Sequence, residues 1–226
     1  MPDLDLNPLF LSLLRPLMPW CAWAGDPTVP AVALSFDDGP HPAHTPPLLD
    51  VLAGHNVRAT FFCLGDRLDA ATGVVRRAAA DGHELAVHGD VHRSFFFRRT
   101  ADVVAAVSRT RDRIAVVAGI SPAAIRLLRP PFGHVGPGQA RALRAAGFAV
   151  VQASVVPGDW SAPSPRVVRR VLRHARNGSL VAMHDGDNGG ADVARSVDQI
   201  IPALRSRGVS FVSVGELLAP RPPLRA

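Results

Sequence analysis

The chain has 226 residues, 47% of them hydrophobic and 19% charged, a balance that excludes a disordered or fibrous protein and fits one large domain. Its 25 basic residues are all Arg and outnumber the 19 acidic ones, but they are scattered without interleaved aromatic residues, so we expect no nucleic-acid partner. Two cysteines, Cys21 and Cys63, are too few for a disulfide framework or a cysteine-based zinc site.

Residues 1–30 form an apolar N-terminal segment. Its most apolar part, Leu9–Trp23, is interrupted by Arg15 and Pro16 and is too short for a membrane-spanning helix. Acidic residues stand before it where a secretory signal carries positive charge. We therefore expect a helical turn at one end of the fold, with a membrane-surface contact or a degraded leader as the alternatives. The same features predict a cytoplasmic or membrane-peripheral protein, with a location in the cell envelope or secretion as the alternative.

Short apolar runs alternate with helical patterns over residues 31–218, which we interpret as one domain. The predicted strands are Ala31–Phe36, Arg58–Phe62, Glu84–Val87, Ile125–Leu128, Phe148–Ser154, Leu180–Met183 and Val209–Val214. The predicted helices cover Leu48–Ala53, Ala70–Ala80, Ala101–Val117, Gln139–Ala146, Arg166–Arg176 and Val193–Arg207. Pro202 is expected to kink or restart the last helix, because proline lacks a backbone N–H. Residues 219–226 are Pro-rich and are expected to fray as a tail.

Repeated strand–helix units predict a parallel sheet with right-handed crossovers. An open doubly wound sheet and a barrel are the two architectures of this α/β class. A complete (β/α)8 barrel takes about 250 residues, so about seven strands in a chain of this length fit an incomplete barrel. In either architecture, functional side chains are expected beyond the carboxyl ends of the strands.

Polar residues follow five of the predicted strands. Taken singly, each group is common in turns or in packed loops. Together they place carboxylates, imidazoles and one guanidinium at the same end of the sheet, which predicts a functional site there. In chain order the groups are Asp37-Asp38, His88 with His92, Arg129, Asp159-Trp160 and His184.

The pair His88 and His92 is spaced by four residues, which we interpret as one side of a helical turn where two imidazoles share a metal ion. A zinc protease would need Glu directly after the first His, and Gly89 stands there, so that site is excluded. Asp38 can supply a third ligand. Two His and one carboxylate leave a position for water, as a hydrolytic metal site requires, and Asp37 is then placed to act as a base.

These five ordered motifs resemble the polysaccharide deacetylase family, carbohydrate esterase family four, which includes nodulation-type chitooligosaccharide deacetylases. The resemblance covers Ala31–Leu218 and includes Gly39-Pro40-His41-Pro42 and Ala59-Thr60-Phe61-Phe62. It implies a distorted, incomplete (β/α) barrel, in agreement with the seven predicted strands. It also implies a hydrolase that removes N-acetyl groups from GlcNAc-containing saccharides: chitooligosaccharides, peptidoglycan or lipid-linked amino sugars. An O-acetyl carbohydrate esterase, as on acetyl-xylan, and a non-catalytic saccharide-binding relative are the alternatives.

The resemblance implies a metal-dependent mechanism. It assigns one divalent metal ion, in the first place zinc and otherwise cobalt or another first-row metal, to the ligands Asp38, His88 and His92. Asp37 is carried over as the general base. Arg129 matches the residue that pairs with this carboxylate and keeps it ionised and aimed.

The remaining matches imply the acid and the substrate pocket. His184 matches the acid that protonates the leaving amine, and Asp159 matches the carboxylate that orients it. The backbone N–H of Phe132, where the family usually has Tyr, would stabilise the oxyanion. Trp160 and Ala182, the latter replacing a common Leu, would line the acetyl pocket. The implied partner is a saccharide, and we expect a monomer.

Three further residues lie on the motif loops. His41 and His134 are either surface residues or contacts to substrate at the rim of the site. Asp185 follows the predicted acid, and we expect it to brace its loop rather than to react.

Overall fold

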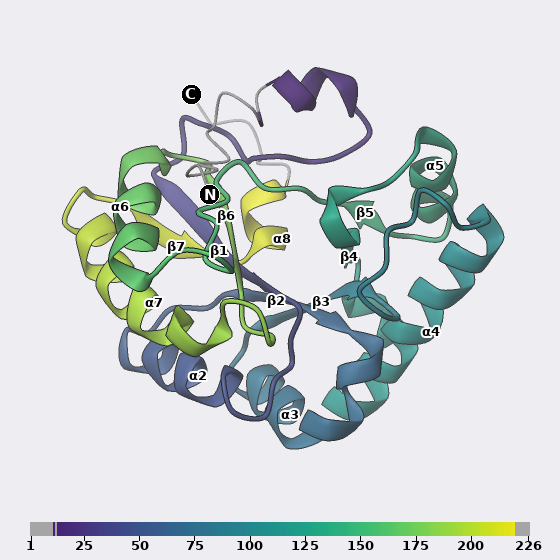
Figure 1. Cartoon of the computed structure of the whole chain (residues 1–226), viewed down its shortest axis with the longest axis horizontal. Helices are drawn as coiled ribbons and strands as arrows, with labels where there is room; N and C mark the ends of the chain where they lie inside the picture. The colour runs from purple at the N-terminus through teal and green to yellow at the C-terminus, as the bar shows by residue number, and fades with distance from the viewer. Residues whose placement is uncertain (1–10, 12, 220–226) are drawn as a thin grey trace, which may run out of the picture.

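In the described part of the chain, seven parallel strands curl into an incomplete barrel, and most of the helices lie along its outside (Figure 1). The computed structural model describes residue 11 and residues 13–219, so the first part of the N-terminal segment and nearly all of the predicted tail lie outside the described residues. The predicted distorted, incomplete (β/α) barrel is confirmed. The strands are β1 (Ala31–Asp37), β2 (Thr60–Leu64), β3 (Glu84–Gly89), β4 (Leu127–Leu128), β5 (Ala149–Val150), β6 (Leu180–His184) and β7 (Ser210–Val212).

The predicted helices are present between these strands. Helix α7 continues through Pro202 to Arg205, so the proline does not restart the helix, and only the last turn follows it. The α-helices are α2 (Thr45–Gly54), α3 (Thr72–Ala80), α4 (Thr100–Ala118), α5 (Pro137–Ala145), α6 (Ser164–His174), α7 (Gly190–Arg205) and α8 (Val214–Leu218). The 3₁₀ helices are η1 (Arg15–Leu17), η2 (Gly65–Arg67), η3 (Asp69–Ala71), η4 (Pro122–Ala124) and η5 (Pro131–Gly133).

The strands lie in the order β5-β4-β3-β2-β1-β6, and β7 pairs with the first residues of β1. The predicted strand Phe148–Ser154 is longer than β5, because its chain leaves β4 and bends toward the other edge of the sheet. There Val155 forms a bridge with Val181 of β6, and Ala182 donates a backbone hydrogen bond of 2.9 Å to Val155. This bent segment brings the two edges of the barrel together.

The N-terminal segment also joins the sheet. Ala22 pairs with Val151, donating to the carbonyl of Val150 at 2.9 Å and accepting from the N–H of Gln152 at 2.7 Å. The 3₁₀ helix η1 precedes this contact, where we expect a helical turn. No helix in the described part of the chain combines the length and the apolar character needed to cross a bilayer.

Successive strand residues point to opposite sides of the sheet, as the period of two requires. In β1, Val32, Leu34 and Phe36 belong to the layer between the strands and the helices. Ala31 and Ala33 belong to the second layer, inside the barrel, where small side chains fit. The same alternation turns the side chain of the last strand residue, Asp37, toward the interior of the barrel.

Candidate active site

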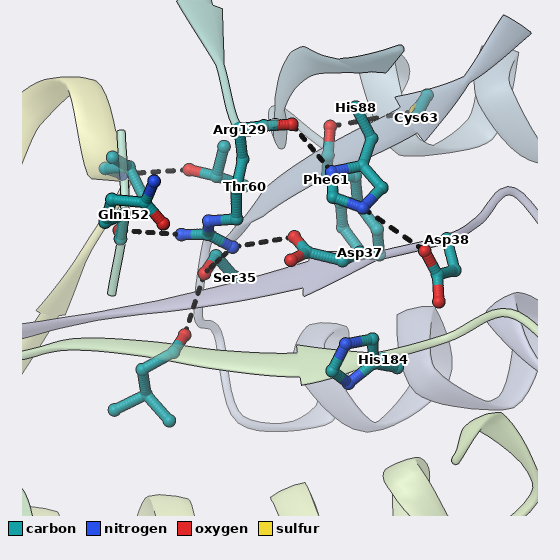
Figure 2. Close-up of polar contacts among 12 residues, drawn as sticks. Ser35, Asp37, Asp38, Thr60, Phe61, Cys63, His88, Arg129, Gln152 and His184 are labelled. Atoms are coloured by element: carbon teal, nitrogen blue, oxygen red, sulfur yellow. Dashed lines mark hydrogen bonds and ion pairs between the residues drawn. The ribbon is translucent and has the colours of Figure 1, made fainter. Parts of the chain in front are cut away.

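The carboxyl ends of four strands bring the predicted polar residues together (Figure 2). Asp37 is the last residue of β1 and Asp38 follows it; His88 lies near the end of β3 and His184 ends β6. Arg129 comes directly after β4. Because all pairs of strands are parallel, these ends lie at the same end of the barrel, where the sequence predicts the site.

Asp38, His88 and His92 form one cluster of metal-binding side chains. Their donor atoms all lie within 4.8 Å of one another, and Oδ1 of Asp38 is 3.3 Å from Nε2 of each imidazole. The expected helical turn is wrong, since His88 is in β3 and His92 is in the loop beyond it. Gly89 lies between them at φ 126°, a backbone conformation that side-chain-bearing residues rarely adopt, and the chain turns there without forming a helix.

This cluster fits a small divalent cation. Two donors bound to one tetrahedral ion at about 2.0–2.1 Å lie about 3.3 Å apart, in agreement with the distances between Asp38 and the two imidazoles. Oδ1 of Asp38 is buried and has no hydrogen-bond partner among the described residues. Nδ1 of His88 lies 2.8 Å from the backbone carbonyl of Arg129. Because that bond places the proton on Nδ1, Nε2 presents a lone pair to the cluster.

The protonation states suit metal binding. Burial disfavours the ionised form of Asp38, but the neighbouring imidazoles of His88, His184 and His92 outweigh it and lower the pKa of Asp38 to about 2. Burial also lowers the pKa of His92. An ionised carboxylate and a neutral imidazole are the forms that bind metal ions.

Asp37 faces a permanent cation inside the barrel. Its Oδ1 accepts a hydrogen bond of 2.6 Å from Arg129, and both residues are buried. The guanidinium also donates to Oγ of Ser35 at 2.9 Å and to the carbonyl of Gln152 at 3.3 Å, and it lies 4.1 Å from the ring centroid of Phe62. Burial lowers the pKa of Arg129, and the opposing effect of the Asp37 charge offsets only part of this lowering. These contacts fix the guanidinium, which in turn fixes the orientation of the carboxylate.

His184, at the end of β6, is held by the carboxylate of Asp159, which lies in a loop. Its Nδ1 lies 2.9 Å from Oδ1 of Asp159, and its backbone N–H donates to Oδ2 at 2.7 Å. Burial disfavours the charged imidazole, but Asp159, followed by Asp37 and Asp38, raises the pKa of His184 to about 9. The imidazole is therefore protonated at neutral pH, with Nε2 available to give up a proton.

The three residues predicted to bind substrate lie close to this site. The ring of Phe132 packs edge to face on His92, with centroids 4.4 Å apart. Trp160 packs edge to face on His184, with centroids 5.1 Å apart. Ala182 is buried in the interior layer of the barrel, two residues before His184 and on the same side of β6.

Three supporting residues have no part in the predicted site. Ser35 and Gln152 hold the guanidinium of Arg129. Ser35 stands two residues before Asp37, and in a strand this spacing places both side chains on the same face of the sheet. Thr45 donates its hydroxyl to the buried carboxyl of Asp185. The backbone N–H of Asp185 donates to the carbonyl of Asp37 at 3.1 Å, in keeping with a bracing role.

Residues 24–151 match the model of the polysaccharide deacetylase family. The chain is similar to the chitooligosaccharide deacetylase of Sinorhizobium fredii, with 36% identity over 190 residues that cover 79% of this chain and 87% of that protein. It is also similar to the peptidoglycan-N-acetylglucosamine deacetylase PgdA of Listeria monocytogenes, with 34% identity over 187 residues. That alignment covers 82% of this chain but 38% of the Listeria protein, so the chain spans well under half of that relative.

Solved structures show the same fold. The Bc1960 peptidoglycan N-acetylglucosamine deacetylase, in complex with 4-naphthalen-1-yl-N-oxidanyl-benzamide, superposes with a TM-score of 0.82 at 29% identity, covering 88% of this chain and 92% of that one. BA3943 of Bacillus anthracis, described as a pseudoenzyme of the same family, superposes with a TM-score of 0.80 at 20% identity, covering 87% of this chain and 68% of that one. The second likeness concerns the fold alone, so function has to be argued from the side chains of the site.

Proposed function

Since the chain belongs to the polysaccharide deacetylase family, we propose that it is a metal-dependent hydrolase that removes N-acetyl groups from GlcNAc-containing saccharides. One observation carries the proposal. The cluster of Asp38, His88 and His92 lies beside Asp37, a carboxylate paired with Arg129, and beside His184, an imidazole that is protonated at neutral pH. A ligand set, a base and an acid are the groups that amide hydrolysis needs.

The metal ion belongs to the Asp38, His88 and His92 cluster, with zinc as the first candidate and cobalt or another first-row metal as the alternatives. When bound, such an ion supplies a Lewis acid that polarises the acetyl carbonyl and lowers the pKa of a water molecule toward about 7. The steps that follow are the work of the chain's own groups.

Asp37 takes the proton of the attacking water. Its Oδ1 is occupied by the hydrogen bond from Arg129, so Oδ2 is the atom that accepts the proton. The backbone N–H of Phe132 donates to the oxygen that becomes negative when the water adds to the carbonyl.

His184 gives a proton to the leaving nitrogen, so that the sugar departs as an amine and the acyl group as acetate. Nδ1 of the imidazole is engaged with Asp159, which leaves Nε2 as the donating atom. The acetyl methyl group lies against Trp160, which packs on the ring of His184, and against Ala182, which stands two residues before His184 in β6.

The test is acetate release from a panel of chitooligosaccharides, peptidoglycan fragments and acetyl-xylan by zinc-loaded protein. We expect acetate together with one free amine per acetate from the GlcNAc-containing substrates. Asp37→Asn is expected to lower the rate by about 10²–10⁴-fold, the range of a positioned proton-transfer group, while metal content is unchanged. Acetate from acetyl-xylan alone would replace the proposal with an O-acetyl esterase. Saccharide binding without any acetate release would replace it with a binding protein.

A further inference from the structure

A row of ring contacts extends from the metal cluster along the surface. The first contact joins His92 to Phe132 edge to face, with centroids 4.4 Å apart. Phe132 and His134 follow at 5.7 Å, and His134 then stacks on Phe96 at 4.7 Å with the two planes 8° apart. The rings come from two different loops, one after β3 and one after β4. The surface formed by Phe132, His134 and Phe96 is called the aromatic platform below.

The two loops are tied to each other and to the core. Oγ of Ser94 lies 3.0 Å from Nδ1 of His134, which links one loop to the other. The side-chain amide of Gln139 donates to the carbonyl of Phe95 at 2.6 Å and to that of Arg98 at 3.1 Å. The ring of Phe95 is fully buried. The platform is therefore held in place before any ligand arrives, which reduces the entropy lost on binding.

The platform presents apolar rings to solvent at a cost. Phe132 is 62% exposed and Phe96 is 52% exposed, although both rings pack against histidines. Phe132 also adopts a left-handed backbone conformation, with φ 58°, which is strained for a residue with a side chain. Burying these rings elsewhere would stabilise the fold, so their exposure beside the metal cluster indicates a ligand that covers them.

We propose that the aromatic platform binds the saccharide unit next to the one that is deacetylated. This inference rests on the proposed function and names a second binding position for the same substrate. One face of a pyranose ring carries several C–H groups, whose hydrogens are slightly positive, and an aromatic ring offers a negative face of similar size. The stack of His134 on Phe96, with the two planes 8° apart, holds the two rings in place.

Contact with a bilayer is the competing explanation for exposed phenylalanines. That contact would depend on Phe97, which is 97% exposed on the same loop and lies outside the three ring contacts. The platform favours a saccharide, because its Phe132 packs on the proposed metal ligand His92 and its His134 is an imidazole that can hydrogen-bond to hydroxyl groups. Phe97 therefore provides a matched control: it is the same residue type, adjacent in sequence, and it is not part of the platform.

The experiment compares a chitotetraose with the single sugar GlcNAc in the zinc-loaded Asp37→Asn background, where hydrolysis of bound saccharide is slowed by about 10²–10⁴-fold. Calorimetry measures Kd for both ligands, with and without Phe96→Ala. We expect Phe96→Ala to weaken tetramer binding by about three- to tenfold, the range of one aromatic contact, and to leave the affinity for GlcNAc unchanged. Phe96→Trp keeps a stacking ring and is expected to retain the tetramer affinity, whereas a role in folding alone would not be rescued in this way.

Kinetics with the active protein provide a second readout. The ratio of kcat/KM on the tetramer to kcat/KM on a small aryl acetate is expected to fall in Phe96→Ala, through KM, and to stay unchanged in Phe97→Ala. Equal tetramer affinity with and without Phe96 would overturn the platform while leaving the proposed deacetylase activity intact. The protein could instead bind to phosphatidylglycerol vesicles and lose this binding in Phe96→Ala and in Phe97→Ala, with the tetramer affinity unchanged. That result would overturn the saccharide-binding platform in favour of membrane contact. Absence of acetate release from every substrate would instead contradict the proposed function.

Discussion

Two adjacent carboxylates, Asp37 and Asp38, have different surroundings because of one step along the backbone. Asp37 still follows the alternation of β1, so its side chain points into the barrel and meets Arg129 at 2.6 Å. Asp38 adopts φ 72°, which ends the strand and turns its side chain toward His88 and His92. Of these two adjacent residues, Asp37 is therefore suited to act as a base and Asp38 to act as a metal ligand.

The charge state of His184 leads to a prediction about pH. The imidazole has to be protonated to act as an acid, so activity is present below its pKa and is lost as pH rises through that value, about 9. Asp159→Asn removes the largest of the contributions that raise this pKa, and the lowering effect of burial remains. We expect the alkaline limb of the kcat profile to move to lower pH by at least about one unit in Asp159→Asn.

The control for this pH profile is Asp198→Asn, which removes the carboxylate 2.8 Å from the surface residue His55. Its alkaline limb should coincide with that of the wild type. An alkaline limb that Asp159→Asn leaves in place would show that another group titrates there, and His184 would lose its assignment as the acid.

The small side chain of Ala182 leads us to predict that the enzyme accepts acyl groups longer than acetyl. A leucine at this position would add three carbons, each buried methylene being worth about 0.8 kcal/mol, and a tight apolar pocket rejects one extra methylene by about 1–3 kcal/mol. The neighbouring Met183 belongs to the outer layer and faces away from the site, so it does not line the pocket at Ala182. We expect propionyl and acetyl esters of one aryl alcohol to be hydrolysed at comparable kcat/KM, and Ala182→Leu to restore a preference for acetyl. Equal discrimination by both proteins would mean that other side chains already close the pocket.

Among the elements, the strands and helices could be predicted because their apolar periods are strong and their ends carry turn residues. The predicted strand Phe148–Ser154 shows the limit of that reasoning. Its apolar residues are buried except for Ala149, yet Ala149 and Val150 pair with β4, whereas Val155 pairs with β6. An apolar composition indicates that a segment is buried, but it does not indicate which strand the segment pairs with. The bend between β5 and Val155 could therefore not be predicted from the sequence. Helix α8 has five residues, too few for a helical period to stand out.

In the site, too, some features could be predicted from the sequence and others could not. Residues with metal-binding or acid–base side chains at strand ends could be found from their type and position. The helical turn expected for His88 and His92 was a coincidence of spacing: a strand end and a glycine turn bring them together instead. Ser35 and Gln152 could not be assigned as supports of Arg129, because neutral polar residues in strands have no distinctive chemistry until their partner is placed.

Helix α8 is a stabilising element at the amino ends of the strands, far from the chemistry. Its N-terminal residues donate to side chains that begin β2 and β3: Val214 to Thr60 at 2.8 Å and Gly215 to Glu84 at 2.9 Å. Oγ of Ser213 accepts from the N–H of Glu216 at 3.2 Å, and the Glu216 carboxylate accepts from the N–H of Ser213 at 2.8 Å. These reciprocal bonds form a capping box.

We expect Ser213→Ala to lower the free energy of unfolding by about 1 kcal/mol, the usual value of an N-cap, and to leave kcat/KM unchanged. Urea denaturation measures the first quantity and acetate release the second. Ser121→Ala is the matched control, since Ser121 caps a three-residue 3₁₀ helix at an exposed position and should have a smaller effect. A loss of activity in folded Ser213→Ala protein would contradict the separation of the stabilising end from the catalytic end.

At the scale of the whole molecule, the barrel concentrates negative charge at one end. Asp37, Asp38 and the buried Asp185 converge there, and burial followed by the charges of Asp37 and Asp38 raises the pKa of Asp185 to about 7. Arg129 neutralises one of these carboxylates. A bound divalent cation would offset the rest, so occupancy of the site should be coupled to the stability of the entire fold.

Removal of the metal is therefore expected to lower the melting temperature. A ligand at one hundred times its Kd stabilises the folded state by about 2.7 kcal/mol, which corresponds to about 5–10 °C in a domain of this size. Chelated protein should melt that much lower than zinc-loaded protein, and elemental analysis should find one ion per chain. His92→Ala should lose both the ion and the shift. His55→Ala, which removes an imidazole paired with Asp198 at the surface, should keep both. Equal metal content in wild type and His92→Ala, or a melting temperature that chelation leaves unchanged, would remove the Asp38, His88 and His92 cluster from consideration as the metal site.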